Sequence, residues 1–236
     1  MIPQKLHCRV KDILDHGERV YSVFLKPENL APRFLPGQFL HLALDKYTPG
    51  DFWPDSRSFS IASAPVERQS LRITYAVKGQ FTGRMETELY PGREVWVKMP
   101  YGEFIVNAEN DVCLLAGGTG VTAFTAFIAG LPAEHPRHVY LFYGARCPDL
   151  LIYRPLVEAA EQRCSNLQIR FLAEQDTERT DCLLGRIDAA TVFGSISDPL
   201  SVTYYLTGPP EMIGSLTSGL SQRGVTPDRL VADAWE

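Results

Sequence analysis

A short stretch near the middle of the first half, Arg57–Ser60, combines side chains that could hold a flat anionic cofactor. It reads RSFS within a predicted strand, so Arg57 and Phe59 project from one face and Ser58 and Ser60 from the other. A guanidinium can bind a phosphate, an aromatic ring can stack on a heterocycle, and a hydroxyl or amide can reach a ring nitrogen. A half-buried strand with an exposed arginine would have the same sequence, so this stretch alone leaves both interpretations open.

A second candidate, Gly79–Thr82, reads GQFT and lies between a predicted strand and a predicted helix over residues 82–89. Backbone amides at a helix N-terminus favour an anionic group such as a pyrophosphate. The alternative is an ordinary strand-to-helix turn in which Thr82 caps the helix.

The third candidate is the glycine turn at residues 115–123, LAGGTGVTA, which contains G-x-G-x-x-A beginning at Gly118. It follows an apolar strand and opens a helix, the context in which glycines let a backbone approach a dinucleotide phosphate. The acidic residue usual after the second strand is missing, since Arg146 follows residues 138–145. A tight turn that only packs a strand against a helix is the competing interpretation.

The elements that must position these motifs change character along the chain. The first hundred residues read as short strands separated by Pro-Gly turns, which predicts a six-stranded antiparallel barrel. The expected strands cover residues 7–13, 20–26, 38–44, 58–62, 71–77 and 94–98.

From Asp111 onward, apolar strands alternate with helices, which predicts a Rossmann-like parallel sheet. The boundary is expected near residues 106–110, giving domains of 1–107 and 108–236. Strands are expected at 112–116, 138–144, 167–173, 201–206 and 229–235, with helices ending near 130 and covering 150–163 and 211–223.

Composition excludes several classes of protein. With 23 basic and 28 acidic residues the net charge is -5, so no positive field attracts nucleic acid. Residues 112–133 carry no charge, but their glycines divide them into a strand, a turn and a helix rather than a membrane span. The first ten residues lack the apolar run of a signal peptide, which predicts a cytoplasmic protein.

The cysteines indicate reduced thiols and no metal site. There are five of them, and no two form a CxxC pair, which argues against a zinc or iron-sulfur site of the usual spacing. They are Cys8, Cys113, Cys147, Cys164 and Cys182.

Seven motifs stand in one order along nearly the whole chain, and together they resemble the ferredoxin-NADP reductase superfamily. The similarity is to its stand-alone flavin reductases and to the reductase components of oxygenases. The motifs are LPGQF at 35–39, RSFSIAS at 57–63, GQFT at 79–82, PYGEF at 100–104, LLAGGTGVTAF at 114–124, YGARCPDLLIY at 143–153 and YLTGPPEMI at 205–213.

The resemblance implies a flavin site in the barrel. Arg57 would bind the flavin phosphate, Phe59 would pack on the isoalloxazine or ribityl arm, and Ser60 would face N5 as a catalytic contact. The turn of Gly79, Gln80, Phe81 and Thr82 would hold a pyrophosphate, which favours FAD over FMN. Ser58, Tyr75 and Val77 complete the implied flavin-binding set.

It also implies a nicotinamide-nucleotide site in the second domain, lined by Gly117, Gly118, Thr119, Gly120, Thr122, Gly144 and Arg146. Gly208, Pro209 and Met212 would lie near the nicotinamide. Thr207 would guide it, and Asp233 or Glu236 would be a nearby carboxylate, with Thr207 and Asp233 counted as catalytic. Trp235 would cover the flavin face.

Three departures from the family pattern matter. Thr207 replaces the frequent cysteine of the CGPP motif, and Ala123 replaces a proline after the glycine turn. NADP-specific relatives carry Ser-Arg after the third strand, where this chain has Glu174-Gln175. A carboxylate there would repel a 2′-phosphate, so NADH is expected to be preferred to NADPH.

The expected activity is hydride transfer from NADH to flavin, followed by electron transfer to an unidentified acceptor, either a redox protein or a small molecule. Three alternatives remain open. One is an electron-transfer subunit of a larger complex, although such subunits normally carry a C-terminal cysteine cluster and the last cysteine here is Cys182. The others are a free-flavin reductase and a dinucleotide-binding regulator without flavin. The loop at residues 47–56, with Phe52 and Trp53, could shield the flavin or dock an acceptor.

Overall fold

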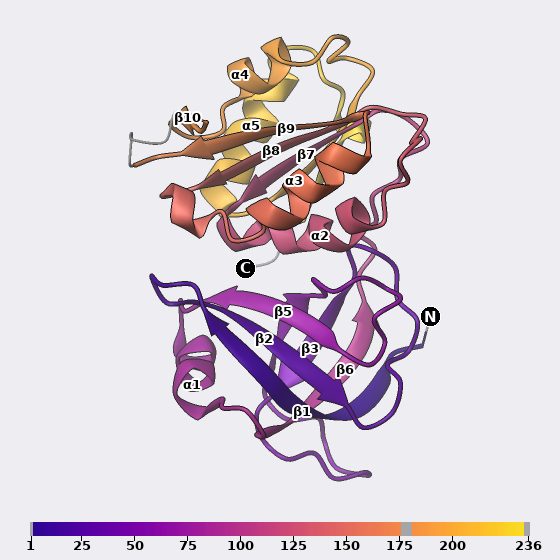
Figure 1. Cartoon of the computed structure of the whole chain (residues 1–236), viewed down its shortest axis with the longest axis vertical. Coiled ribbons are helices and arrows are strands. Elements are labelled where there is room, and N and C mark those ends of the chain that lie inside the picture. The colour runs from indigo at the N-terminus through magenta and orange to yellow at the C-terminus, as the bar shows by residue number, and fades with distance from the viewer. Residues whose placement is uncertain (1, 176–180, 234–236) are drawn as a thin grey trace. The chain divides into compact units, whose positions relative to one another are not determined.

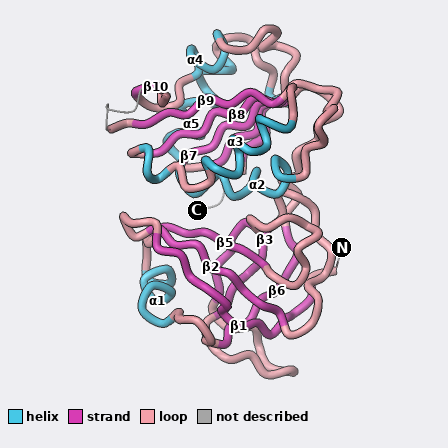
Figure 2. Tube along the Cα trace, in the orientation of Figure 1, coloured by secondary structure: helices cyan, strands magenta, loops and turns pink. Residues whose placement is uncertain are grey.

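A computed structural model describes residues 2–175 and 181–233 of the chain (Figure 1). The chain divides into two compact units, Met1–Ile105 and Val106–Glu236. The first is built of strands with one helix, and the second alternates strands with helices (Figure 2).

The first unit is a six-stranded antiparallel near-barrel, as the turn-punctuated strands predicted. Its strands run in the order β4-β3-β6-β1-β2-β5. The two edge strands approach each other, because the Ala62 amide just after β4 donates to the Arg72 carbonyl of β5 over 2.8 Å. The strands are β1 (Gln4–Asp15), β2 (Val20–Pro27), β3 (Phe39–Ala43), β4 (Ser56–Ser60), β5 (Leu71–Ala76) and β6 (Glu94–Tyr101).

Alternation along the strands builds the core of this unit. Successive side chains of a strand point to opposite faces, and the inward set forms one apolar cluster. Fully buried members of that cluster include Val23, Leu25, Leu40, Leu42, Ile73, Val95 and Val97.

Helix α1 (Gln80–Glu88) begins two residues earlier than predicted. Gly79 is the residue before the first helical turn, and the Gly83 amide closes that turn by donating to the Gly79 carbonyl over 2.8 Å. Thr82 is therefore the third residue of the helix and not its N-cap. Thr82 lies inside the first turn, where its hydroxyl accepts from the amides of Lys78 at 3.0 Å and Gly79 at 3.1 Å.

The second unit is a parallel six-stranded sheet with helices on both faces, in agreement with the Rossmann-like prediction. The strand order is β10-β9-β8-β7-β11-β12. In Figure 1, α3 lies in front of the sheet and α5 behind it. The strands are β7 (Val112–Gly117), β8 (Val139–Ala145), β9 (Leu167–Ala173), β10 (Leu183–Leu184), β11 (Thr203–Thr207) and β12 (Leu230–Ala232).

Helix α2 packs against α3, and α4 packs against α5. Apolar side chains of α4 and α5 join those of β7, β8 and β11 in one buried cluster. The helices are α2 (Thr122–Ala129), α3 (Arg154–Arg163), α4 (Ala189–Gly194) and α5 (Pro210–Ser221), with short 3₁₀ turns at Gly118–Val121, Pro148–Leu150 and Pro227–Arg229.

Three local differences from the predicted elements have clear causes. Helix α3 begins at Arg154 rather than near Leu150, because Pro155 lacks an amide and fits only in a first turn. Helix α4 was not predicted, although the Asp188 carboxylate caps it by accepting from Ala190 and Thr191 amides, each over 2.9 Å. The two-residue strand β10 is too short to leave a periodic pattern.

Candidate functional site

Strand β4 presents the RSFS motif as the alternation predicted. Arg57 lies opposite Leu42 of β3 and Phe59 lies opposite Leu40, so both share the face of two fully buried leucines. Phe59 packs against the barrel core, and its ring centroid is 6.1 Å from that of Tyr75 on β5. An arginine and an aromatic ring therefore emerge from the same side of an edge strand.

Ser58 and Ser60 face the other side of β4, opposite His41 and Phe39. The phenyl ring of Phe39 stacks on Tyr101 at 5.7 Å, and the His41 ring meets Tyr101 edge-on at 4.9 Å. Burial, and secondarily Lys98, lower the pKa of His41. Ser60 is thus the last residue of a strand beside an aromatic cluster, and its contact with N5 of a flavin stays a prediction.

The RSFS strand and the GQFT turn converge at Phe81. The guanidinium of Arg57 lies 5.3 Å from the centroid of the buried Phe81 ring. The same guanidinium donates to the Asp55 carboxylate and to the Ser56 carbonyl, both at 2.9 Å, while its side chain stays 54% exposed. Asp55 is itself exposed, so an incoming phosphate could replace it as the partner of Arg57.

The N-terminus of α1 lies at this point of convergence and has no side-chain cap. The first amides of an α-helix have no partner within the helix, so those of Gln80, Phe81 and Thr82 are directed at whatever lies before it. Gly79 has an extended backbone, and a Cβ added there would meet nothing within 4 Å. Val77, just before the turn, donates its amide to the Arg19 carbonyl over 3.0 Å.

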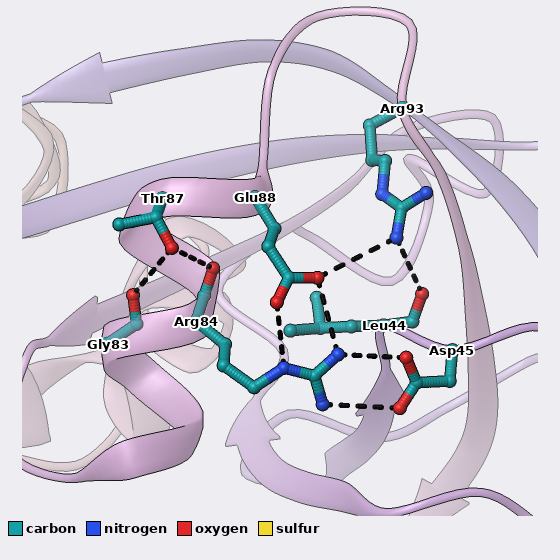
Figure 3. A network of polar contacts seen from close by, with 7 residues as sticks. All are labelled: Leu44, Asp45, Gly83, Arg84, Thr87, Glu88 and Arg93. Atoms are coloured by element: carbon teal, nitrogen blue, oxygen red, sulfur yellow. Dashed lines mark hydrogen bonds and ion pairs between the residues drawn. The ribbon is translucent and has the colours of Figure 1, made fainter.

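Ion pairs hold α1 in place on the barrel. A nine-residue helix containing Gly83 is too short to be stable alone, so it depends on such contacts. Figure 3 shows Arg84 between two carboxylates, at 2.8 Å from Asp45 and 2.7 Å from Glu88. On another side of the helix, Glu86 accepts from Arg19 at 2.6 Å and from the Tyr21 hydroxyl at 3.1 Å.

The second set of predicted residues gathers at the carboxyl edge of the parallel sheet. The strand order reverses between β7 and β11, which is the switch point where open α/β sheets bind their ligands. Gly117 ends β7, and Thr207 ends β11. Their loops touch: a Cβ on Gly117 would lie 2.7 Å from the Met212 sulfur and 2.9 Å from Cδ of Pro209.

Main-chain atoms of the same two loops also come close together. A Cβ on Gly120 would lie 2.8 Å from the carbonyl carbon of Thr207 and 2.9 Å from the amide nitrogen of Gly208. The buried Thr207 hydroxyl donates to the Gly120 carbonyl over 3.1 Å. That hydroxyl is thus engaged within the fold in this structure.

Gly118, Thr119 and Thr122 form the turn between β7 and α2. Gly118 has a left-handed φ of 55°, and a Cβ there would meet nothing within 4 Å. The Thr122 hydroxyl donates to the Thr119 carbonyl over 2.8 Å, which closes the 3₁₀ turn before the helix.

Gly144 and Arg146 lie at the end of β8. Gly144 is covered by Ile187, which a Cβ would approach to 3.1 Å, and Arg146 is exposed. The ends of β8 and β9 stay in register, because the Gln175 amide donates to the Arg146 carbonyl over 2.8 Å.

Asp233 lies just beyond β12, beside the end of β11. Its amide donates to the Leu206 carbonyl over 2.9 Å, and burial raises the pKa of its carboxyl group to about 6. Trp235, predicted to cover a flavin, lies outside the described residues.

One charged residue at this edge was not predicted. The Arg186 guanidinium donates to the Glu174 carboxylate over 2.8 Å, so a cation does lie where the sequence pattern indicated an unopposed carboxylate. Arg186 is brought to Glu174 by β10 and the residues that follow it, which no motif marked.

Known oxidoreductases are similar to this chain in sequence. A family model described as the oxidoreductase NAD-binding domain matches residues 114–217. The electron transfer component of anthranilate 1,2-dioxygenase from Acinetobacter baylyi is 26% identical over 207 residues, covering 86% of this chain and 58% of that protein. The reductase component of propane 2-monooxygenase from Rhodococcus jostii is 26% identical over 247 residues, covering 98% of this chain and 64% of that protein.

Solved structures share the fold of the whole chain. A cytochrome P450 reductase from Amycolatopsis aligns with a TM-score of 0.83 at 20% identity, covering 98% of this chain and 69% of that one. A ferredoxin NADP⁺ reductase from Neisseria gonorrhoeae with bound FAD and NADP aligns with a TM-score of 0.80 at 16% identity, covering 97% and 98%.

The fold joins an antiparallel near-barrel to a parallel sheet, and the second unit matches the NAD-binding domain of oxidoreductases. The chain as a whole is similar to reductases of the ferredoxin-NADP reductase superfamily. It spans less than two thirds of the length of the two curated relatives described above.

The part of the chain that the structure describes has neither a membrane-spanning helix nor a cluster of metal ligands. No helix among them is long and apolar enough to cross a bilayer. Within the same residues, no group of three or more His, Cys, Asp or Glu side chains could hold a metal ion. The cysteines are free, with Cys8, Cys113 and Cys164 buried.

Proposed function

We propose that this chain is a FAD-dependent oxidoreductase that takes hydride from NADH and delivers electrons to a redox partner protein. Flavin binding is assigned to the first unit and nicotinamide-nucleotide binding to the second. The observation that carries the proposal is the convergence of Arg57, Phe59 and the uncapped N-terminus of α1 on one side of the barrel.

The residues of the first unit fit FAD by charge and by shape. A pyrophosphate needs two groups of donors, and Arg57 together with the amides of Gln80 and Phe81 supplies them. Gly79 leaves open space where a side chain would otherwise stand before the helix. FMN has one phosphate and FAD has two, so two groups of phosphate donors favour FAD. Phe59 and Tyr75 offer aromatic surface to a flat ring.

When bound, FAD supplies the acceptor for hydride from reduced nicotinamide and can release the electrons to a partner. The chain itself needs no dedicated acid-base pair for this chemistry, so its work is binding and orientation. We assign Ser60 as the contact to the flavin ring and the Gly117–Thr122 turn as the support of the nucleotide phosphates. In the second unit, the main-chain approach of Gly120 to Thr207 holds the two loops of the switch point together.

The donor is proposed to be NADH rather than NADPH, because the Glu174 carboxylate can accept from ribose hydroxyls and opposes a 2′-phosphate. The acceptor is proposed to be a protein, because two curated relatives are named as the electron transfer or reductase components of oxygenases. The loop before β4 offers it an apolar contact, since Phe52 is 100% exposed while Trp53 is tied to Ser56 by a 3.0 Å hydrogen bond.

The test is an anaerobic absorbance titration of the purified chain reconstituted with FAD. NADH is expected to bleach the flavin band, and NADPH to do so with a lower kcat/KM. Arg57→Gln should weaken FAD binding, whereas Arg9→Gln, which removes another exposed arginine of the same unit, should leave it unchanged.

If the protein binds nicotinamide nucleotide but no FAD, even when FAD is supplied in excess, it is a dinucleotide-binding regulator without flavin and the proposal is wrong. Bleaching only in the presence of free flavin that turns over as a substrate would favour the free-flavin reductase.

A further inference from the structure

We propose that Asp55 competes with the phosphates of FAD for the guanidinium of Arg57, so that this carboxylate lowers the affinity of the first unit for FAD and speeds its release. The inference rests on the proposed binding of FAD at Arg57. It adds a residue that determines how tightly the cofactor is held, and that residue lies outside both the RSFS and the GQFT motifs.

The contact between Asp55 and Arg57 is direct and local. Nη1 of Arg57 donates to Oδ1 of Asp55 and to the Ser56 carbonyl, each over 2.9 Å. The two charged residues are two positions apart in the chain, so the carboxylate is tethered to the guanidinium at a high effective concentration. A phosphate that approaches Arg57 therefore meets a negative charge that is already in contact with it.

Contacts of the loop before β4 keep Asp55 in this place. Nε1 of Trp53 donates to Oγ of Ser56 over 3.0 Å, so a hydrogen bond spans the chain on both sides of Asp55. The ring of Trp53 lies 5.3 Å from that of Tyr47, centroid to centroid. The Tyr47 hydroxyl accepts from Nζ of Lys5 on β1 over 2.6 Å, which ties the loop to the barrel.

Arg57 is held close to the N-terminus of α1 by a different contact. Its guanidinium lies 5.3 Å from the centroid of the Phe81 ring, which is buried in the first turn of that helix. Nη1 makes both of its hydrogen bonds, so Nε and Nη2 can bind a phosphate placed before the helix. Phosphate and carboxylate then share one cation or exchange on it, and their like charges oppose each other in both cases.

The strength of the pair suits competition and not exclusion. The side chains of Arg57 and Asp55 are 54% and 59% exposed, and an exposed pair of this kind contributes little stability. FAD can therefore displace Asp55 at small cost. When a phosphate leaves, the carboxylate can take its place on the guanidinium, which favours release. Removing the carboxylate should make FAD bind more tightly and leave more slowly.

The test measures the dissociation constant of FAD by fluorescence quenching at low salt, and its release rate by stopped-flow dilution. Asp55→Asn should lower the dissociation constant by about three- to fivefold, as expected for one exposed charge beside a phosphate. Most of the change should appear as slower release. Asp55→Glu, which keeps the carboxylate, should retain most of the unmodified affinity.

Two controls separate the contact with Arg57 from a general effect of charge. Asp51→Asn removes another exposed carboxylate of the same loop, which makes no ion pair within the part of the chain that the structure describes, and it should leave FAD affinity nearly unchanged. In an Arg57→Gln background, Asp55→Asn should no longer tighten binding, because the shared cation is gone. Both side chains of the pair are more than half exposed, so these variants should fold, as circular dichroism would verify.

Three outcomes would overturn the inference while leaving the proposed function intact, provided that Arg57→Gln weakens FAD binding. They are an unchanged or higher dissociation constant in Asp55→Asn, equal tightening by Asp51→Asn, and tightening that persists in the Arg57→Gln background. If Arg57→Gln does not weaken FAD binding, or if the unmodified protein binds no FAD, the proposed flavin site is wrong and this inference falls with it.

Discussion

Replacing Gly120 by alanine tests whether the nucleotide turn depends on close main-chain approach. The new Cβ would lie 2.8 Å from two atoms of Thr207 and 2.9 Å from the Gly208 nitrogen. All three are main-chain atoms, so no side chain can rotate away. The two loops must separate by about 0.6 Å to reach ordinary van der Waals contact, which begins at 3.4 Å.

Overpacking of this kind costs about 1–3 kcal/mol. It also stretches the 3.1 Å hydrogen bond from the Thr207 hydroxyl to the Gly120 carbonyl. For a unit of this size the melting temperature should fall by roughly 4–11 °C. Because the displaced loops form the switch point, binding of NAD⁺ should weaken at the same time.

Differential scanning calorimetry and titration with NAD⁺ measure the two effects on the folded protein. Gly214→Ala is the matched control, because Gly214 lies in α5 of the same unit and a Cβ there meets nothing within 4 Å. That variant should be as stable as the unmodified protein or more stable by about 1 kcal/mol, since alanine favours a helix. A Gly120→Ala protein with unaltered melting temperature and NAD⁺ affinity would refute the reasoning.

Three further predictions concern single side chains. Thr207→Val should lower the free energy of unfolding by about 1 kcal/mol in urea, because the Gly120 carbonyl loses its donor, whereas Thr207→Ser should not; equal stability of both would show that the hydroxyl is not structural. Burial raises the pKa of Asp233 from 3.8 to about 6, so the folded state binds this proton more tightly than the unfolded chain does. The free energy of unfolding should therefore fall as the pH rises from about 4 to about 6. Asp233→Asn should flatten that part of the pH profile of the urea midpoint, and an unchanged slope would assign it to other groups. Arg84→Gln should raise the dissociation constant for FAD by about threefold, measured by fluorescence quenching, because α1 loses its contact with Asp45; unchanged affinity would mean that the Glu86 contacts suffice to place the helix.

The order of elements was predictable because each unit has a simple periodicity. In the barrel, a period of two is visible in β2 and β5, whose inward residues are aliphatic or aromatic. In the sheet, β7 and β8 are buried on both faces and therefore appear as continuous apolar runs. Helix α4 lacks both patterns, since only Ala189 and Val192 are buried along its six residues.

Some contacts of the candidate sites could be predicted from the sequence, and others could not. The proximity of Arg57 to Phe81 could be expected, because the resemblance assigns the RSFS and GQFT motifs to one flavin site. The pairing of Arg186 with Glu174 could not, because it depends on the path of the chain after β9 and on one surface hydrogen bond. Motifs predict what a family has in common, whereas a local contact such as this one depends on the particular path of the chain.

The glycines show why a fingerprint alone is weak support for a ligand. Gly117 and Gly120 are required by the approach of neighbouring atoms, so a chain that bound no nucleotide would need them equally. Gly79 is different, because its φ of -151° suits any residue and a Cβ there would meet nothing within 4 Å. Glycine at Gly79 is consistent with its place as the N-cap of α1, and it also leaves room for a ligand at the helix N-terminus. Glycines in both units can therefore be explained by the fold, so the proposed anion sites depend on the charged and aromatic side chains beside them.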